Sequence, residues 1–383
     1  MTTRLRESRT VRQWGIPRGV IVLVGLAAAV VAAGGVRAMA WMIGPIFLAL
    51  MIVIAVSPVQ GWMRRRGLPG WSATLVLILG TYAVLIVMVL VLVVSVAQLA
   101  TELPQYADQA QQLVGTATSA LSRLGVGEEQ LQAIAGSLDW GRIAGWVGSL
   151  LSGLAGTIAN LVFLLALLLF LGVEAATAGA RLGAIGRDRP DAAAALAGFA
   201  VRTRKYLVVT TVFGLIVAVL DTAALMIIGV PLAFTWGLLS FITNYIPNVG
   251  FVIGLIPPAV LGLLEGGPSM MIAVIVLYSV LNFVVQSLIQ PRFVGDSVGL
   301  SATVTFLALI FWTWLIGPLG AILAIPMTLL AKALLVDIDP SARWADALLR
   351  SRPGDPGETD VDGTASGRPD GATEGADAAS VPR

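Results

Sequence analysis

The sequence predicts an all-α, polytopic integral membrane protein with about eight transmembrane segments, two of them broken or re-entrant helices. Its composition is the first reason. Of the 383 residues, 57% are hydrophobic and 12% are charged, a balance that soluble globular domains do not have. The second reason is that hydrophobic residues gather in runs of about 20 residues or more, enough for a helix to cross a bilayer core about 30 Å thick. The third is the clustering of Arg beside those runs.

The first half of the chain contains four predicted spans. Residues 1–18 form a basic cytoplasmic leader, and residues 19–97 contain three N-terminal transmembrane helices. The four spans are residues 19–36, 41–59, 71–97 and 153–173. The fourth belongs to a segment, 152–205, that ends in a basic cytoplasmic loop at 174–205.

Residues 98–151 interrupt this pattern. Several Gln alternate with Leu, Ile and Ala at helical spacing, and acidic residues outnumber basic ones. The segment therefore predicts an extracytoplasmic insert of two or three amphipathic helices. It is either a helical cap that lies on the membrane surface or a lid or assembly domain.

The orientation follows from Lys and Arg near the ends of the spans, because loops rich in these residues stay in the cytoplasm. The basic leader, residues 64–66 and the 174–205 loop all carry clustered Arg. The N-terminus is thus predicted to be cytoplasmic, and the C-terminus is cytoplasmic in either arrangement of the second half. Residues 339–383 are predicted to be a cytoplasmic tail, mostly disordered, because most of this segment is rich in Gly, Pro and Asp and poor in aromatic residues.

Residues 206–338 have the features of a transport unit. One apolar run, from about 230 to 264, would be about 50 Å long as a single helix, which is too long for a simple span. Its centre holds two Asn, a Pro and a Gly within residues 244–250. Pro removes a helix hydrogen bond and Gly relaxes the backbone. A broken helix at membrane depth is tolerated only where it is buried in protein or lines a wet cavity.

A second overlong run, 300–336, is interrupted at 317–320, and residues 265–268 form a predicted turn. If both runs are tilted spans, the chain crosses the membrane eight times. If both are re-entrant hairpins, there are six full spans and two hairpins. The lengths favour hairpins, because each half-run has only about 15 residues.

The two interrupted runs also resemble each other. Residues 250–257 and 320–326 are alike when one residue is deleted, and each follows a Pro closely. Inverted repeats of broken helices indicate a transporter binding site near the membrane midplane. The alternative is that Gly, Ile and Pro recur by chance in an apolar sequence.

Several short motifs follow one another in this half. They are Gly-Val-Pro at 229–231, Ile-Pro-Asn-Val-Gly at 246–250, Ile-Gly-Leu-Ile-Pro at 253–257, Gln-Pro-Arg at 290–292, Gly-Pro-Leu-Gly at 317–320 and Ile-Pro at 325–326. In their order and spacing the chain resembles the autoinducer-2 exporter family over about residues 15–340. The resemblance implies about eight transmembrane segments and the export of autoinducer-2 or other small solutes. It also implies that sodium/proton antiport is an alternative, because some members of the family are antiporters.

Polar or helix-breaking residues within the apolar runs are the predicted transport pathway. They are Asn244, Pro247, Asn248, Gly250, Asn282, Gln286, Gln290, Pro291, Pro318 and Gly320. Amide side chains and freed carbonyls can coordinate a polar solute or a cation without fixed charge. The alternative is that the amides satisfy the broken backbone or link neighbouring helices.

Asp221 is the one ionisable residue well inside a predicted span. A charge at that depth is expensive, so the residue is a candidate for ion coupling through a proton or a sodium ion. The alternative is that Asp221 bonds to a polar neighbour such as Asn244 or Asn282 and holds helices together.

The sequence therefore predicts a transporter that moves a small polar solute or cation across the bacterial cytoplasmic membrane by alternating access. The alternatives are a sodium/proton antiporter that uses Asp221 and a non-transporting membrane scaffold. The chain lacks Cys, His and a Walker motif, so an enzyme, a cofactor and a metal are not expected. The expected partners are the lipid bilayer, the solute and further copies of the chain in a homo-oligomer, with no nucleic acid.

Overall fold

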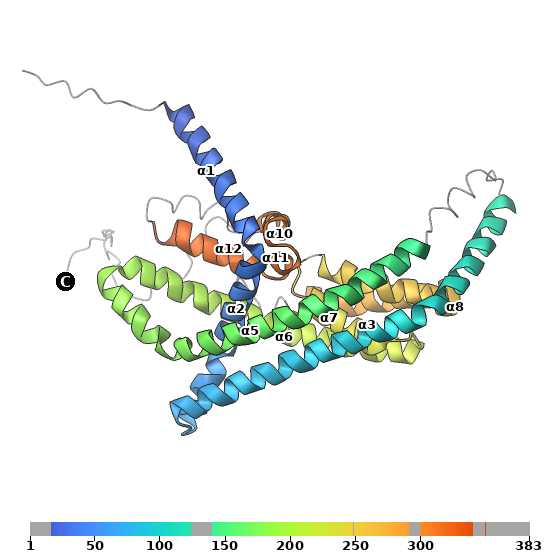
Figure 1. Ribbon diagram of the computed structural model, residues 1–383, viewed down its shortest axis with the longest axis horizontal. Coiled ribbons are helices and arrows are strands. Elements are labelled where there is room, and N and C mark those ends of the chain that lie inside the picture. Colours follow the sequence, from blue (N-terminus) through green and yellow to red (C-terminus); the bar gives the residue numbers. More distant parts are fainter. Residues whose placement is uncertain (1–16, 124–139, 248, 291–298, 340–348, 350–383) are drawn as a thin grey trace, which may run out of the picture.

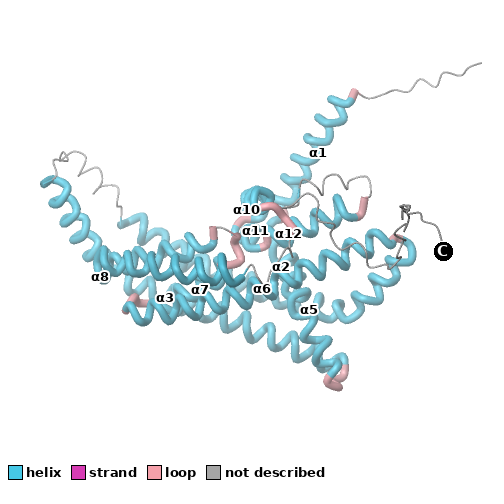
Figure 2. The backbone as a smooth tube through the Cα atoms, turned by 180° about the vertical axis from the view of Figure 1, so that it is seen from behind, coloured by secondary structure: helices cyan, strands magenta, loops and turns pink. Residues whose placement is uncertain are grey.

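The computed structural model describes residues 17–123, 140–247, 249–290, 299–339 and 349. Within these ranges every regular element is a helix, so the predicted all-α class is confirmed. Six helices of the described part are long and apolar enough to cross a membrane, and two further apolar helices are shorter. The helices form an elongated molecule from which α1 projects, as both views show (Figure 1 and Figure 2).

The first half consists of long helices. They are α1 (Arg18–Ala38), α2 (Ala40–Arg65), α3 (Gly70–Arg123), α5 (Trp140–Asp188) and α6 (Pro190–Ile228). The four spans predicted for this half lie inside the first four of these helices. α2 and α5 pack through Ala49, Leu164 and Leu168. The apolar part of α1, in contrast, has no buried residue.

α3 and α5 are longer than the predicted spans, so the predicted boundaries at 97 and 151 fall inside helices. Residues 98–123 continue α3 and residues 140–152 begin α5, while residues 124–139 lie outside the described part. The outer part of α3 bends (Figure 1), and it contains Pro104, a residue type that kinks helices. A change from apolar to polar side chains does not by itself end a helix, because the backbone hydrogen bonds are unaffected.

The prediction of a loop at 174–205 was wrong, because the segment is helical. α5 runs to Asp188 and α6 begins at Pro190, with only Arg189 between them. Proline suits the first position of a helix, where its missing N–H would have no partner in any case. The run of Ala that follows Asp191 has high helix propensity, and this outweighs the polarity on which the loop prediction relied.

The second half contains mostly shorter elements. They are α7 (Ala233–Thr243), α8 (Gly250–Asn282), the π-helix η1 (Phe283–Ile289), α10 (Ala302–Ile316), α11 (Pro318–Ile322), α12 (Ala324–Lys332) and the π-helix η2 (Ala333–Asp337). Both overlong runs are broken where the sequence predicts it, between α7 and α8 and at Gly317.

α7 and the first part of α8 form a helical hairpin, here called the first hairpin. With 11 residues, α7 is about 16 Å long, half the thickness of a bilayer core. The two arms run antiparallel. Near the break, a Cβ added to Gly254 would lie 3.6 Å from the Cα of Ser240. At the other end of the arms, Trp236 of α7 packs in one cluster with Leu261 of α8.

α8 doubles back at Gly267, whose φ of 72° and ψ of −166° are not helical. A Cβ added to Gly262 would lie 3.4 Å from side-chain atoms of Met270 and Val274. In a straight helix, residues 262 and 274 would be about 18 Å apart. The predicted turn at 265–268 is confirmed, and the apolar stretch from Gly250 to Ile289 is two arms rather than one rod.

α10 forms the second hairpin with α11 and α12. Gly317, with a φ of 83°, ends α10 and allows the chain to reverse. Trp312 Nε1 of α10 donates a hydrogen bond of 2.9 Å to Thr328 Oγ1 of α12. Leu309 also packs with Ala324, so these arms are antiparallel as well. Both overlong runs are therefore folded back on themselves, and how deep they lie in a membrane stays a prediction.

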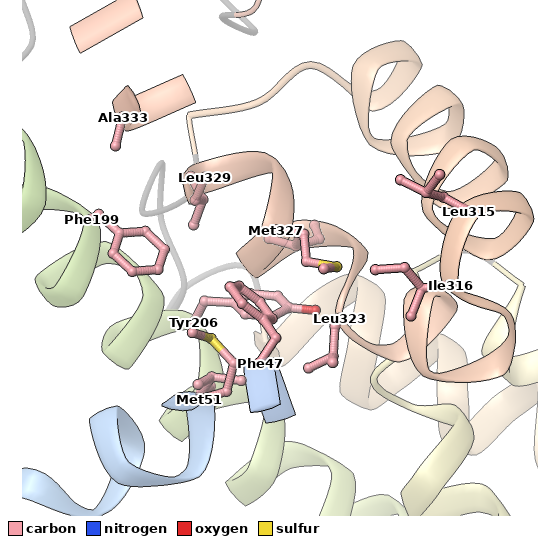
Figure 3. Close-up of a cluster of buried hydrophobic side chains, with 12 residues drawn as sticks. Phe47, Met51, Phe199, Tyr206, Leu315, Ile316, Leu323, Met327, Leu329 and Ala333 are labelled. Atoms are coloured by element: carbon pink, nitrogen blue, oxygen red, sulfur yellow. The ribbon is translucent and has the colours of Figure 1, made fainter. Parts of the chain in front are cut away.

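The largest apolar cluster joins the second hairpin to the first half of the chain (Figure 3). Phe47 and Met51 of α2 meet Tyr206 of α6 and Leu323 and Met327 of the second hairpin. This packing fixes the second hairpin against α2 and α6, whereas the first hairpin contacts mainly α6.

A charged cluster adds a second link between the two parts. Asp337, at the end of η2, accepts from Arg202 of α6 at 2.8 Å and from Lys332 of α12 at 2.7 Å. The three side chains are 20%, 35% and 12% exposed, so this cluster is partly shielded from solvent. The Asp337 carboxylate therefore ties the end of the second hairpin to the start of α6.

We expect Asp337→Asn to lower the free energy of unfolding by about 1 to 3 kcal/mol, because hydrogen bonds to charged groups contribute this much. The measurement is thermal unfolding of the purified protein in detergent. Glu174→Gln is the matched control, since the Glu174–Arg181 pair is 3.4 Å long and both side chains are more than half exposed. Equal melting temperatures for the two variants would contradict a structural role for the Asp337 cluster.

Candidate transport site

A cavity of about 870 Å³ lies where α6, the break between α7 and α8, the second arm of α8 and η1 meet. Its polar wall includes Thr210, Asn244, Asn282, Gln286 and Gln290. The apolar wall includes Ile246, Phe251, Phe283 and Ile325. None of the described residues that line the cavity is an Asp, Glu, Lys or Arg, so it offers hydrogen bonds without fixed charge.

Three amide side chains from separate parts of the chain meet in this wall, and are here called the amide cluster: Asn244, Asn282 and Gln286. Gln286 Nε2 donates to Asn282 Oδ1 at 2.6 Å and to Asn244 Oδ1 at 3.1 Å. Asn244 Nδ2 donates to Thr210 O of α6 at 3.1 Å, and Asn282 Nδ2 donates to Tyr278 O at 2.9 Å. The cluster thus connects α6, the first hairpin and the second arm of α8.

Local structure explains why these residues meet. Asn282 and Gln286 are four residues apart and so share one helix face. The chain passes from α-helix to the π-helix η1 directly after Asn282, and π-helical turns are frequent at functional sites. Asn244 follows the last residue of α7, where the helix ends and its side chain faces α6.

Backbone groups at the break between α7 and α8 form hydrogen bonds with one another. Ile246 N donates to Thr243 O at 2.8 Å, and Gly250 N donates to Ile246 O at 3.0 Å. Asn244 is therefore not needed to satisfy the break, which was one alternative for its role. Pro247 lines the cavity, whereas Asn248 lies outside the described residues.

Gly250 and Gly320 occupy equivalent places in the two hairpins. A Cβ on Gly250 would lie 1.8 Å from Thr243 O, and one on Gly320 would lie 1.9 Å from Trp312 O. In both hairpins a Gly opens the second arm against a carbonyl of the first arm. This shared geometry favours the repeat interpretation over chance recurrence. Neither these two glycines nor Pro318 line the cavity, so their contribution here is to packing.

The structure extends the predicted site. Gln290 lines the cavity as predicted, while Pro291 lies outside the described residues. Tyr206 and Ile325 also line it and were not predicted. Ile325 has no signal in the sequence, because it reaches the cavity only through the packing of the second hairpin.

Thr210 was also missed, although the sequence holds a signal for it. Gly214 follows one turn later, and a Cβ there would lie 2.8 Å from Asn244 Nδ2. A Thr and a Gly on one face of an apolar helix indicate a close polar approach, here that of Asn244 to α6.

Asp221 is fully buried and does not line the cavity. Ser240 Oγ of α7 donates to its Oδ2 at 2.5 Å. The neighbours suggested from the sequence, Asn244 and Asn282, bond elsewhere. Asp221 therefore links α6 to α7 through Ser240, one helical turn from Asn244.

Residues 20–338 match the sequence profile of the AI-2E family transporter. The chain belongs to the AI-2E transporter family. The AI-2 transport protein TqsA of Escherichia coli (strain K12) is 30% identical over 317 residues, which cover 83% of this chain and 92% of TqsA. The "Putative transport protein YhhT" of the same strain is 28% identical over 338 residues, covering 88% of this chain and 96% of YhhT.

Membership of the AI-2E transporter family confirms the resemblance seen in the sequence. With six long apolar helices, it makes the chain a multi-pass membrane transporter of the bacterial inner membrane. The matched region, 20–338, contains the amide cluster and both hairpins. A transporter family also agrees with the expectation that the chain is not an enzyme.

Proposed function

We propose that this AI-2E transporter moves a small polar solute across the cytoplasmic membrane by alternating access, with the 870 Å³ cavity as its binding site. The observation that supports the proposal most directly is the amide cluster. Three amides in one cavity wall are costly among apolar helices unless they serve a polar ligand or one another. They already bond to one another, yet they still line an open space large enough for a solute.

The lining indicates the chemistry of the solute. Amides, a Thr carbonyl and two Ser hydroxyls offer donors and acceptors, and aromatic and aliphatic side chains cover the remaining wall. Such a site suits an uncharged, polyol-like solute, or a weakly bound cation. The name of TqsA makes AI-2 the first solute to test.

The proposal includes an orientation and an assembly. The junction between α2 and α3 carries Arg64, Arg65 and Arg66. The junction between α5 and α6 carries Arg187 and Arg189. Since basic residues stay inside, both junctions and both termini are cytoplasmic. The unburied apolar surface of α1 is covered by lipid or by another copy of the chain in a homo-oligomer.

Single Cys substitutions test the binding site, because the natural chain contains no Cys. Ser279→Cys and Ser287→Cys place a thiol in the cavity wall with little change in size. We expect both to react with a water-soluble maleimide in membrane vesicles, and AI-2 or another transported solute to slow the reaction. Ser269→Cys, in the exposed turn after Gly267, is the control that solute leaves unchanged.

Two outcomes favour other functions. If neither cavity position reacts from either side of the membrane, the cavity is closed to water, and this result favours the non-transporting scaffold. If Ser287→Cys reacts but no solute slows the reaction, water enters the cavity but the cavity does not bind the solute.

A further inference from the structure

Asp221 and Tyr278 form an unusual polar pair in the described part of the protein. Asp221 is 0% exposed and Tyr278 is 1% exposed. Oδ2 of Asp221 accepts from Ser240, while Oδ1 has no hydrogen-bond partner, and the hydroxyl of Tyr278 has none either. Tyr278 packs in one cluster with Leu225, which follows Asp221 by one turn of α6, so the two groups lie in the same part of the interface between α6 and α8.

The three helices that meet here, α6, α7 and α8, place no basic residue near the carboxylate. α7 contains no titratable residue, and α8 contains only Tyr278 and Glu265. On α6, the nearest basic residue is Lys205, 16 positions before Asp221 and therefore about 24 Å along the helix. Among the described residues, Ser240 is the side chain that donates a hydrogen bond to the Asp221 carboxylate. An ionised carboxylate that is buried with one hydrogen bond and no cation costs several kcal/mol.

We propose that Asp221 is a proton-binding site, and that the structure represents its protonated, neutral form. A proton on Oδ1 removes the buried charge and turns the unpartnered acceptor into a donor. The step is simple acid dissociation: the carboxylic acid releases one proton to water and becomes a carboxylate, with no electron transfer.

A proton fits this place better than a sodium ion. Metal ions in transporters bind where unwound backbone frees carbonyl oxygens as ligands. Asp221 lies within α6, an unbroken helix from Pro190 to Ile228, so the neighbouring carbonyls are used by the helix. Asp221 is not in the wall of the 870 Å³ cavity or of two smaller ones in the described part, and a proton needs no cavity.

The position of the site suggests how proton binding is coupled to transport, and this step rests on the proposed function. Ser240 and Asn244 are one turn apart at the end of α7, and Tyr278 and Asn282 are one turn apart in α8. The proton site and the amide cluster therefore use the same three helices. A movement of α7 away from α6 breaks the Ser240 bond and admits water to Asp221, and it also changes the cavity wall at Asn244.

Infrared difference spectroscopy of the full chain in lipid nanodiscs tests proton binding without any transported solute. We expect the wild type at neutral pH to show a C=O band of a protonated carboxylic acid that is lost in Asp221→Asn. Asp191→Asn is the matched control, because Asp191 is an exposed carboxylate at the start of the same helix. If the Asp221→Asn substitution changes the carboxylate stretching bands but leaves the C=O band of carboxylic acids unaltered, Asp221 is ionised and the proposal is overturned.

Ser240→Ala gives a second test that does not depend on the folding of Asp221→Asn. It keeps the carboxyl group and removes the hydrogen bond to Oδ2, so the band is expected to shift to higher wavenumber. A band that does not move belongs to another group, and the assignment to Asp221 then fails.

Transport in proteoliposomes separates this proposal from the proposed function. With AI-2 as the probe, an imposed pH gradient is expected to stimulate uptake by the wild type and Asp191→Asn but not by Asp221→Asn. Asp221→Asn should still show solute protection at Ser287→Cys. If protection is absent in all forms but the infrared band depends on Asp221, the proposed function fails and the proton site stands. If Asp221→Asn retains full stimulation by the gradient, coupling through Asp221 is refuted.

Discussion

Gly250→Ala and Gly320→Ala are each expected to destabilise the protein by about 3 kcal/mol or more, the upper end of the range for overpacked sites. A methyl group at these positions would lie 1.8 Å from Thr243 O and 1.9 Å from Trp312 O. Both contacts are with backbone atoms, which cannot rotate away as a side chain can. The arms of the hairpin must separate instead. The measurement is the melting temperature and the yield of monodisperse protein in detergent.

Gly80→Ala is the control for both variants. Gly80 lies in the membrane-crossing part of α3, and a Cβ there would meet no atom within 4 Å. This variant is expected to be neutral or to gain up to about 1 kcal/mol from the higher helix propensity of Ala. If Gly250→Ala proves as stable as Gly80→Ala, the arms of the first hairpin do not pack as the structure describes.

Gln286→Leu is expected to reduce transport about tenfold or more, because it removes the donor shared by two other amides. Leu has a similar size but leaves Asn244 Oδ1 and Asn282 Oδ1 without the hydrogen bonds that Gln286 supplies. Each unsatisfied buried acceptor costs about 1 to 3 kcal/mol. Solute uptake into proteoliposomes at equal protein content is the measurement.

Gln60→Leu is the matched control for this loss of an amide. Gln60 Nε2 donates to Thr74 Oγ1 at 2.7 Å, between α2 and α3 and away from the cavity. We expect this variant to change stability slightly and to keep its uptake. Equal losses of uptake in both variants would mean that general packing, rather than the amide cluster, limits transport.

The two broken runs could be predicted from the sequence because their signals are local. Pro247 and Gly317 interrupt apolar stretches that are too long for one span and whose halves are too short for two. Asn244, Asn282 and Gln286 could be selected for the same reason, since amides are rare and expensive in apolar helices. The structure brings these three together in the wall of one cavity, and their role in a transport pathway stays a prediction.

Features that depend on contacts between distant segments could not be predicted. Ile325 reaches the cavity only because the second hairpin packs on α2 and α6. Asp221 bonds to Ser240 rather than to an amide, and nothing in the spacing of α6 and α7 distinguishes these partners. The ends of α3 and α5 were missed because polarity marks where a membrane begins, whereas backbone hydrogen bonds decide where a helix ends.

The chain enters and leaves the first hairpin at the same end of its two arms, here called the base. Gly229 and Leu232, both with positive φ, precede α7, and Gly267, also with positive φ, follows the other arm. Val230, Leu232 and Leu264 share one cluster, so both attachments lie at the same end. The tip, with Asn244 and Pro247, is the part that lines the cavity.

If α7 moves away from α6 as proposed above, the first hairpin turns about this base. Its arm is the length of α7, so a rotation of roughly 15° about the base moves the tip by roughly 4 Å. That distance is more than the diameter of a water molecule. The tip side chains that line the cavity would then move furthest. We therefore expect a substitution at the base to change the rate of transport without altering the cavity wall.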